Sequence, residues 1–144
     1  MYMAFPLKYV AVKVGEQASP VQNAERYVRA FSRRTGKRAV PCPVLFSRQR
    51  SEGCNVVGMV DGVVGNDGIV EVRRFPSRHA PMTEGTELGL QTYMWLTKKE
   101  RAFLVRVFEE GESELYGSED PNVGEWDYVC VERRNVNLND FCDL

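Results

Sequence analysis

The sequence predicts a single α/β domain in which helices flank a mixed β-sheet. Strand-like and helix-like segments follow one another in the order strand, helix, strands, helix, strand, strand, an order typical of α/β proteins. The 144 residues suit one domain, residues 1–144, and 43% of them are hydrophobic, enough to build a core. No apolar run reaches the roughly 20 residues that span a membrane, so we expect no membrane partner.

The first third of the chain is predicted to contain a strand, a helix and a second strand. Residues 2–14 favour one strand or two short ones, because β-branched and aromatic residues dominate there. From Val21, apolar residues recur at steps of three and four, which predicts a helix that ends before Gly36. Residues 44–46 favour a short strand, followed by a basic loop over residues 48–50.

The stretch over residues 58–74 is predicted to form two short strands joined by a tight turn. The turn falls on Gly65–Gly68, where the sequence Gly-Asn-Asp-Gly tolerates positive φ. A hairpin of this kind would hold the carboxylates of Asp61 and Glu71 near each other. Alternation along the second strand places Arg73 on the same face as Glu71.

The rest of the chain is predicted to contain one more helix and two more strands. The expected elements are a loop over 75–85, a helix over 87–101, a buried strand over 102–108, an acidic loop over 109–123, a strand over 126–133 and a short helix or tail over 135–144. No G-x-G-x-x-G motif follows the first strand, and the chain has no P-loop, G-x-S-x-G or H-E-x-x-H motif.

Asp61 and Glu71 are candidate ligands for a hard divalent cation. Mg²⁺ and Mn²⁺ prefer oxygen ligands, and the backbone carbonyl of Val72 would add one more. The cation would lower the pKa of a bound water and neutralise charge on a phosphate. Arg73 would hold that phosphate but cannot accept a proton. The alternative is an exposed aspartate in a turn beside a Glu–Arg surface pair.

Positive charge is concentrated in the first three quarters of the chain. Residues 1–106 hold 17 Lys and Arg against 9 Asp and Glu, a balance of +8, whereas residues 107–144 carry a balance of −9. A basic surface is a candidate for phosphate contacts with nucleic acid, and the alternative is an ordinary solvated face. The arginines expected to contact DNA are Arg26, Arg29, Arg33, Arg34, Arg48, Arg50, Arg74 and Arg78.

The four cysteines form no C-x-x-C pair. Since the N-terminus lacks a secretory signal, we expect free thiols in a reducing compartment and an intracellular, non-secreted protein in the cytoplasm or nucleus of a cell or infected host. The alternative is a four-cysteine metal or iron–sulfur site.

An ordered set of motifs runs through residues 20–110. A helix with Glu25 and Thr35-Gly36 is followed by Val60-Asp61-Gly62, by Gly68-Ile69-Val70-Glu71-Val72-Arg73 and by a helix with Gln91. In this order the motifs resemble the PD-(D/E)XK nuclease superfamily, particularly its lambda-exonuclease-like group, the YqaJ viral recombinases. The resemblance implies a restriction-endonuclease-like core over about residues 20–110, with an acidic C-terminal segment over 109–144.

The function that this resemblance implies is a metal-dependent DNA nuclease, with an exonuclease as the expected type, in recombination, repair or viral or phage DNA processing. The implied partners are DNA, a viral or phage single-strand annealing protein and further copies of the chain. The implied site residues are Asp61, Glu71 and the Val72 carbonyl as ligands of Mg²⁺ or Mn²⁺, Glu25 and Gln91 as helix residues that complete and orient the site, and Arg73 at the position of the family's lysine.

Several of these residues have a second interpretation. Glu25 could pair with Arg29, four residues on, and Gln91 could be an exposed helix residue. Trp95 and Met94 fit a core better than a base-stacking surface, and His79 fits an ordinary loop better than a phosphate contact. Because arginine cannot act as a general base, a second hypothesis is a catalytically inactive relative that binds DNA or a protein partner. A third is a structural or assembly protein with no nucleic-acid role.

Overall fold

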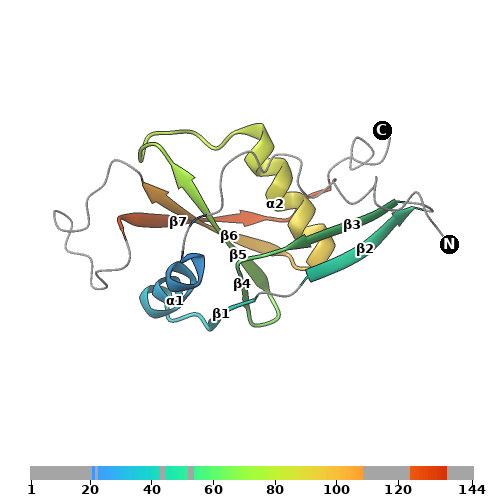
Figure 1. Ribbon diagram of the computed structural model, residues 1–144, viewed down its shortest axis with the longest axis horizontal. Helices are drawn as coiled ribbons and strands as arrows, with labels where there is room; N and C mark the ends of the chain where they lie inside the picture. Colours follow the sequence, from blue (N-terminus) through green and yellow to red (C-terminus); the bar gives the residue numbers. More distant parts are fainter. Residues whose placement is uncertain (1–20, 22, 43–44, 52–53, 109–123, 136–144) are drawn as a thin grey trace.

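The computed structural model describes residue 21 and residues 23–42, 45–51, 54–108 and 124–135 (Figure 1). A five-stranded sheet has the order β1-β4-β5-β6-β7, and β2 and β3 form a separate two-stranded sheet. The elements are α1 (Ala24–Thr35), β1 (Ala39–Pro41), β2 (Leu45–Ser51), β3 (Cys54–Met59), β4 (Gly62–Val64), β5 (Gly68–Phe75), α2 (Glu84–Thr97), β6 (Arg101–Phe108) and β7 (Trp126–Glu132).

The five-stranded sheet is mixed, as the sequence predicts. β5 and β6 run parallel over their whole length, while the other neighbours pair antiparallel. Parallel neighbours need a crossover connection, and α2 provides it between β5 and β6. Neither described helix has the length and apolar character that crossing a membrane requires.

The sheet carries one apolar cluster on each face. Val70 and Val72 of β5 pack with α1, whereas Ile69 and Phe75 of the same strand pack with α2. Because side chains alternate across a strand, Glu71 lies on the α2 face between Ile69 and Phe75. This glutamate is only 3% exposed, so the fold places a carboxylate inside its core.

The predicted hairpin differs from the observed one on its first side. β3 ends at Met59 and pairs with β2, and the strand that pairs with β5 is the short β4. Asp61 lies in the break between β3 and β4. The turn at residues 65–67 is where the sequence predicts it, with Gly65 at φ 51°.

Two other sequence predictions need correction. Residues 48–50, predicted to be a basic loop, belong to β2, which pairs with β3. The helix predicted over 87–101 is α2, which starts at Glu84 because Thr83 caps it by accepting a hydrogen bond from the Thr86 N–H at 3.1 Å. The predictions for residues 2–14, 109–123 and 136–144 fall outside the described residues.

Gly62 of β4 packs tightly against Val28 of α1. A methyl group at this position would lie 2.8 Å from Val28 Cγ1 and 3.0 Å from the Val40 carbonyl oxygen. We therefore expect Gly62→Ala to lower the free energy of unfolding by about 1–3 kcal/mol, measured by urea denaturation.

Gly89 of α2 provides the matched control, since a methyl group there has no heavy atom within 4 Å. Gly89→Ala should raise the free energy of unfolding by about 0.5–1 kcal/mol, because alanine loses less backbone entropy in a helix. Effects of the same sign at both glycines would contradict this packing.

Candidate active site

Asp61 and Glu71 are held together by two hydrogen bonds to the backbone. The Asp61 N–H donates to Glu71 Oε1 at 3.1 Å, and the Val72 N–H donates to Asp61 Oδ2 at 2.7 Å. Each carboxylate thus accepts a hydrogen bond from the segment that carries the other. The structure therefore brings together the two acidic residues that the sequence singles out.

The shortness of β4 creates the space for this arrangement. β4 pairs with β5 over Gly68–Val70 only, so from Glu71 onward no strand among the described residues lies beside this edge of β5. The N–H and C=O of one strand residue point to the same side. Because the Val72 N–H faces Asp61, the Val72 carbonyl faces the same edge, where a metal ligand is predicted.

Arg73 joins the site through Glu71 and Tyr93. Arg73 Nη2 lies 3.0 Å from Glu71 Oε2, and the Arg73 side chain is 18% exposed. Its guanidinium carbon lies 5.9 Å from the centroid of the Tyr93 ring, and the two side chains share a hydrogen bond. Glu71 and Arg73 thus form a mostly buried ion pair rather than the surface pair considered as the alternative.

Burial dominates the electrostatics of these groups. Burial and the nearby Asp61 carboxylate together raise the pKa of Glu71 well above its usual value, and burial also raises the pKa of Asp61. Burial lowers the pKa of Arg73 and raises the pKa of Tyr93 to about 12. A buried carboxylate, Glu71, therefore pairs with the guanidinium of Arg73, while the half-buried Asp61 lies next to Glu71.

Tyr93 is a residue of this site that the sequence analysis does not single out. It lies three residues after Leu90 and next to Met94, both of which belong to the core on the α2 face. A phenol on an apolar helix stripe needs a hydrogen-bond partner when it is buried. This requirement is the sequence signal by which Tyr93 could have been identified as a residue of the site.

Glu25 lies in the first turn of α1. It is exposed and three residues before Val28, so helical spacing puts it on the same face as the side chain that touches Gly62. No group of three or more Asp, Glu, His or Cys suited to a metal occurs among the described residues. The helping role of Glu25 therefore stays a prediction.

Gln91 is buried, at 1% exposed, and is not the exposed helix residue considered as the alternative. Its amide donates to the Glu132 carbonyl at 2.9 Å, and its oxygen accepts from the Arg134 N–H at 2.9 Å. A longer contact, 3.4 Å, joins it to Glu87. These bonds tie α2 to the end of β7, two strands away from β5.

Two of the arginines predicted to contact DNA stack on tryptophan rings. The guanidinium carbon of Arg34 lies 3.6 Å from the centroid of the Trp126 ring, and that of Arg48 lies 4.4 Å from the centroid of the Trp95 ring. Each arginine also donates to the backbone carbonyl of the same tryptophan. Arg48 thereby fastens β2 to the C-terminal end of α2.

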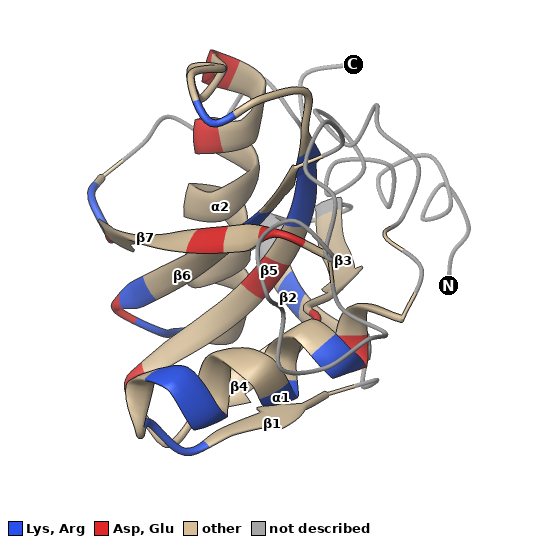
Figure 2. Cartoon of the chain, turned by 90° about the vertical axis from the view of Figure 1, so that its left-hand side faces the viewer, with Lys and Arg blue, Asp and Glu red and all other residues tan. Residues whose placement is uncertain are grey.

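The remaining arginines have varied surroundings. Arg78 forms an ion pair with Glu125 and lies 5.2 Å from the centroid of the Phe108 ring. Figure 2 shows basic residues along α1. Arg29, Arg33 and Arg74 are exposed, Arg26 is half-buried, and the side chain of Arg50 lies outside the described part.

Other residues follow the interpretation that the sequence favours. Met94 is fully buried, Trp95 is half-buried and His79 is exposed in its loop. Cys42 and Cys130 carry free thiols, as expected.

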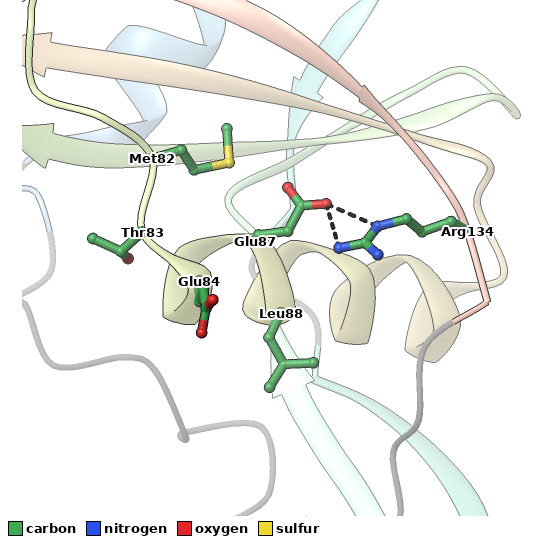
Figure 3. A pocket seen from close by; sticks show the side chains of 6 residues that line it. All are labelled: Met82, Thr83, Glu84, Glu87, Leu88 and Arg134. Atoms are coloured by element: carbon green, nitrogen blue, oxygen red, sulfur yellow. Dashed lines mark hydrogen bonds and ion pairs between the residues drawn. The ribbon is translucent and has the colours of Figure 1, made fainter.

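A hollow of about 510 Å³ lies at the start of α2 (Figure 3). Its lining includes Thr83, Leu88, and the Glu87–Arg134 ion pair, whose atoms approach to 3.2 Å. Asp61, Glu71 and Arg73 do not line it, so the hollow is separate from the candidate site.

Solved structures share the fold of this chain. The alkaline exonuclease LHK-Exo from Laribacter hongkongensis matches with a TM-score of 0.63 at 13% identity, over 97% of this chain and 86% of the other. The structure of LHK-Exo in complex with dAMP matches with a TM-score of 0.55 at 15% identity, over 89% of this chain and 66% of the other. The structure of SSO0001 matches with a TM-score of 0.58 at 13% identity. The match covers 83% of this chain and about half (52%) of the length of SSO0001.

No protein-family model and no curated protein matches the sequence. The structural matches nevertheless confirm the predicted α/β fold, a five-stranded mixed sheet between helices, which this chain shares with the exonuclease LHK-Exo.

The raised pKa of Glu71 predicts a pH dependence of stability. The ordinary pKa of a glutamate is 4.5, and the pKa of Glu71 in the folded state is higher. Protonation of Glu71 therefore contributes its full stabilisation below pH 4.5, and this contribution is lost as the pH rises through the folded-state pKa. The free energy of unfolding of the wild type should therefore fall relative to that of Glu71→Gln as the pH rises from 4.5. Urea denaturation in EDTA measures this difference, with the exposed Glu100→Gln as the control. A difference independent of pH would contradict the burial of this charge.

The hydrogen bonds of Gln91 predict a structural effect of its removal. Gln91→Leu leaves the Glu132 carbonyl and the Arg134 N–H without this partner and should lower the free energy of unfolding by about 1–3 kcal/mol. Calorimetry should find the affinity for Mn²⁺ unchanged. Weaker Mn²⁺ binding with unaltered stability would instead support the orienting role that the resemblance implies.

Proposed function

We propose that this chain is a metal-dependent DNA nuclease of the exonuclease type, acting in recombination, repair or viral or phage DNA processing. The observation that carries the proposal is the convergence of Asp61 and Glu71 at the edge of β5 beyond the end of β4. The fold shared with an exonuclease supports the reaction class. The structure of that exonuclease with dAMP supports a DNA substrate.

The donor set suits Mg²⁺ or Mn²⁺. Asp61 and Glu71 offer carboxylate oxygens and Val72 offers a carbonyl, and Mg²⁺ commonly takes one or two carboxylates together with water. The guanidinium of Arg73 pairs with Glu71 and Asp61 adds a second carboxylate, so a cation would offset the remaining negative charge. When bound, it would supply a water of lowered pKa and neutralise charge on the scissile phosphate.

Arg73 has an electrostatic part in this proposal. A guanidinium holds phosphate oxygens through two parallel hydrogen bonds, but it does not lose its proton in proteins. Arg73 therefore binds and orients the phosphate next to the two acids. It takes no proton from the attacking water.

The surface arginines supply the proposed contacts with the DNA backbone. Arg29 and Arg74 are exposed, and contacts of this type set affinity and salt dependence rather than sequence preference. Arg34 and Arg48 contribute less, since both are engaged with tryptophan. A single-strand annealing protein and further copies of the chain complete the set of proposed partners.

A second candidate is a relative that binds DNA or a protein partner without cleaving. The ion pair between Arg73 and Glu71 favours it, because the guanidinium already compensates the charge of a predicted metal ligand. The two candidates differ in whether a divalent cation binds and DNA is cut.

A nuclease assay separates the candidates. The protein is incubated with end-labelled linear DNA and closed circular DNA in Mg²⁺ or Mn²⁺. We expect degradation of linear DNA only, and Glu71→Ala should lower it at least about a hundredfold, since a bound metal contributes several kcal/mol to stabilising the transition state.

Two further variants sharpen the assay. Glu100→Ala removes an exposed carboxylate that pairs with Arg133 and should cleave like the wild type. Cleavage by Arg73→Lys but not by the wild type would support the second candidate. Degradation of circles as well would remove the exonuclease assignment, and cleavage unaffected by Glu71→Ala would refute the site.

A further inference from the structure

We propose that Tyr93 is a positioning residue for Arg73, in that its phenol oxygen gives the guanidinium an acceptor other than Glu71. The inference deepens the proposed function and rests on it for the phosphate that Arg73 then meets. It concerns a residue on α2, across from β5, the strand that carries Glu71 and Arg73.

The geometry places Tyr93 and Glu71 around the same guanidinium. Arg73 Nη2 lies 3.0 Å from Glu71 Oε2, while the Tyr93 ring centroid lies 5.9 Å from the guanidinium carbon and its hydroxyl shares a hydrogen bond with Arg73. Tyr93 is 5% exposed. A mostly buried cation needs several acceptors, and the other oxygen of Glu71 already accepts from the Asp61 N–H.

The second acceptor matters most when Glu71 shares its charge with a cation. The attraction between Glu71 and Arg73 then weakens, and a long arginine side chain with many rotamers is free to move away. The phenol oxygen is uncharged, so it retains the guanidinium without competing strongly with an incoming phosphate. Tyr93 thereby keeps Arg73 beside the two acids and available to the substrate.

The helix that carries Tyr93 is fixed firmly enough for this task. Gln91 ties α2 to β7 through two hydrogen bonds of 2.9 Å. Arg48 binds the Trp95 carbonyl at 2.6 Å near the other end of the helix. Groups that orient a functional side chain are effective when rigid elements hold them.

A double-mutant cycle tests the link between the two side chains without relying on activity. Tyr93→Phe keeps the ring and removes the hydroxyl, and Arg73→Met removes the guanidinium. We expect Tyr93→Phe to lower the folding equilibrium constant about tenfold in the wild type but less than about twofold in Arg73→Met, because a hydrogen bond to a charged group is lost only in the first. Equal effects in both backgrounds would overturn the inference.

Kinetics test the consequence for the reaction. Tyr93→Phe should lower kcat about tenfold and leave KM for DNA and the Mn²⁺ affinity from calorimetry within about twofold, because the lost orientation acts in the transition state. Tyr128→Phe is the matched control, since Tyr128 is 38% exposed and packs edge-on against Phe31 on the other face. An unchanged kcat in Tyr93→Phe would overturn the inference.

The two proposals fail in different ways. A wild type that shows no metal-dependent cleavage refutes the proposed function, whatever the cycle gives. A wild type that cleaves, combined with no coupling between Tyr93 and Arg73, refutes the role of Tyr93 alone.

Discussion

The site depends on two hydrogen bonds between Asp61 and β5. They occupy backbone groups that the end of β4 would otherwise leave unpaired on a sheet edge, and such groups are costly when buried. The Val72 N–H binds the Asp61 carboxylate, and the Asp61 N–H binds the Glu71 carboxylate. The same two hydrogen bonds therefore satisfy backbone N–H groups at the sheet edge and fix the positions of the two acids. The relative position of the carboxylates is set by the chain itself, without requiring a bound ion.

This arrangement carries an electrostatic cost. Glu71 is more buried than its apolar neighbour Phe75 and almost as buried as Ile69. Because Asp61 lies beside it, burial and mutual repulsion both raise the pKa of Glu71. Arg73 offsets part of this cost, but a buried ion pair repays its desolvation only when its remaining hydrogen-bonding groups are satisfied. The core on the α2 face thus contains a charged cluster that is stable only with well-placed partners, which include Tyr93.

The sequence predicts the half of this site that depends on local rules. The turn chemistry at Gly65–Gly68 and the alternation along β5 give the register, and with it the common face of Glu71 and Arg73. The break between β3 and β4 at Asp61 could not be predicted from local pattern. It occurs where the chain leaves its contacts with β2 and α2, and these contacts are tertiary. The surroundings of Gln91 could not be predicted for a related reason. Buried residues surround α2 on most sides, so spacing alone cannot tell which polar side chain faces β7 and which faces β5.

The pairing of Arg73 with Tyr93 explains how a site of this shape accommodates arginine where the resemblance leads one to expect lysine. An ammonium is a compact charge with three donors, whereas a guanidinium is planar, carries five and keeps its proton. Placed mostly inside the core, the larger group needs acceptors in more than one direction. Glu71 supplies one direction from β5, and Tyr93 supplies another from α2. We therefore infer that Arg73 and Tyr93 form one structural unit, in which the proposed task of residue 73 is to hold negative charge rather than to transfer a proton.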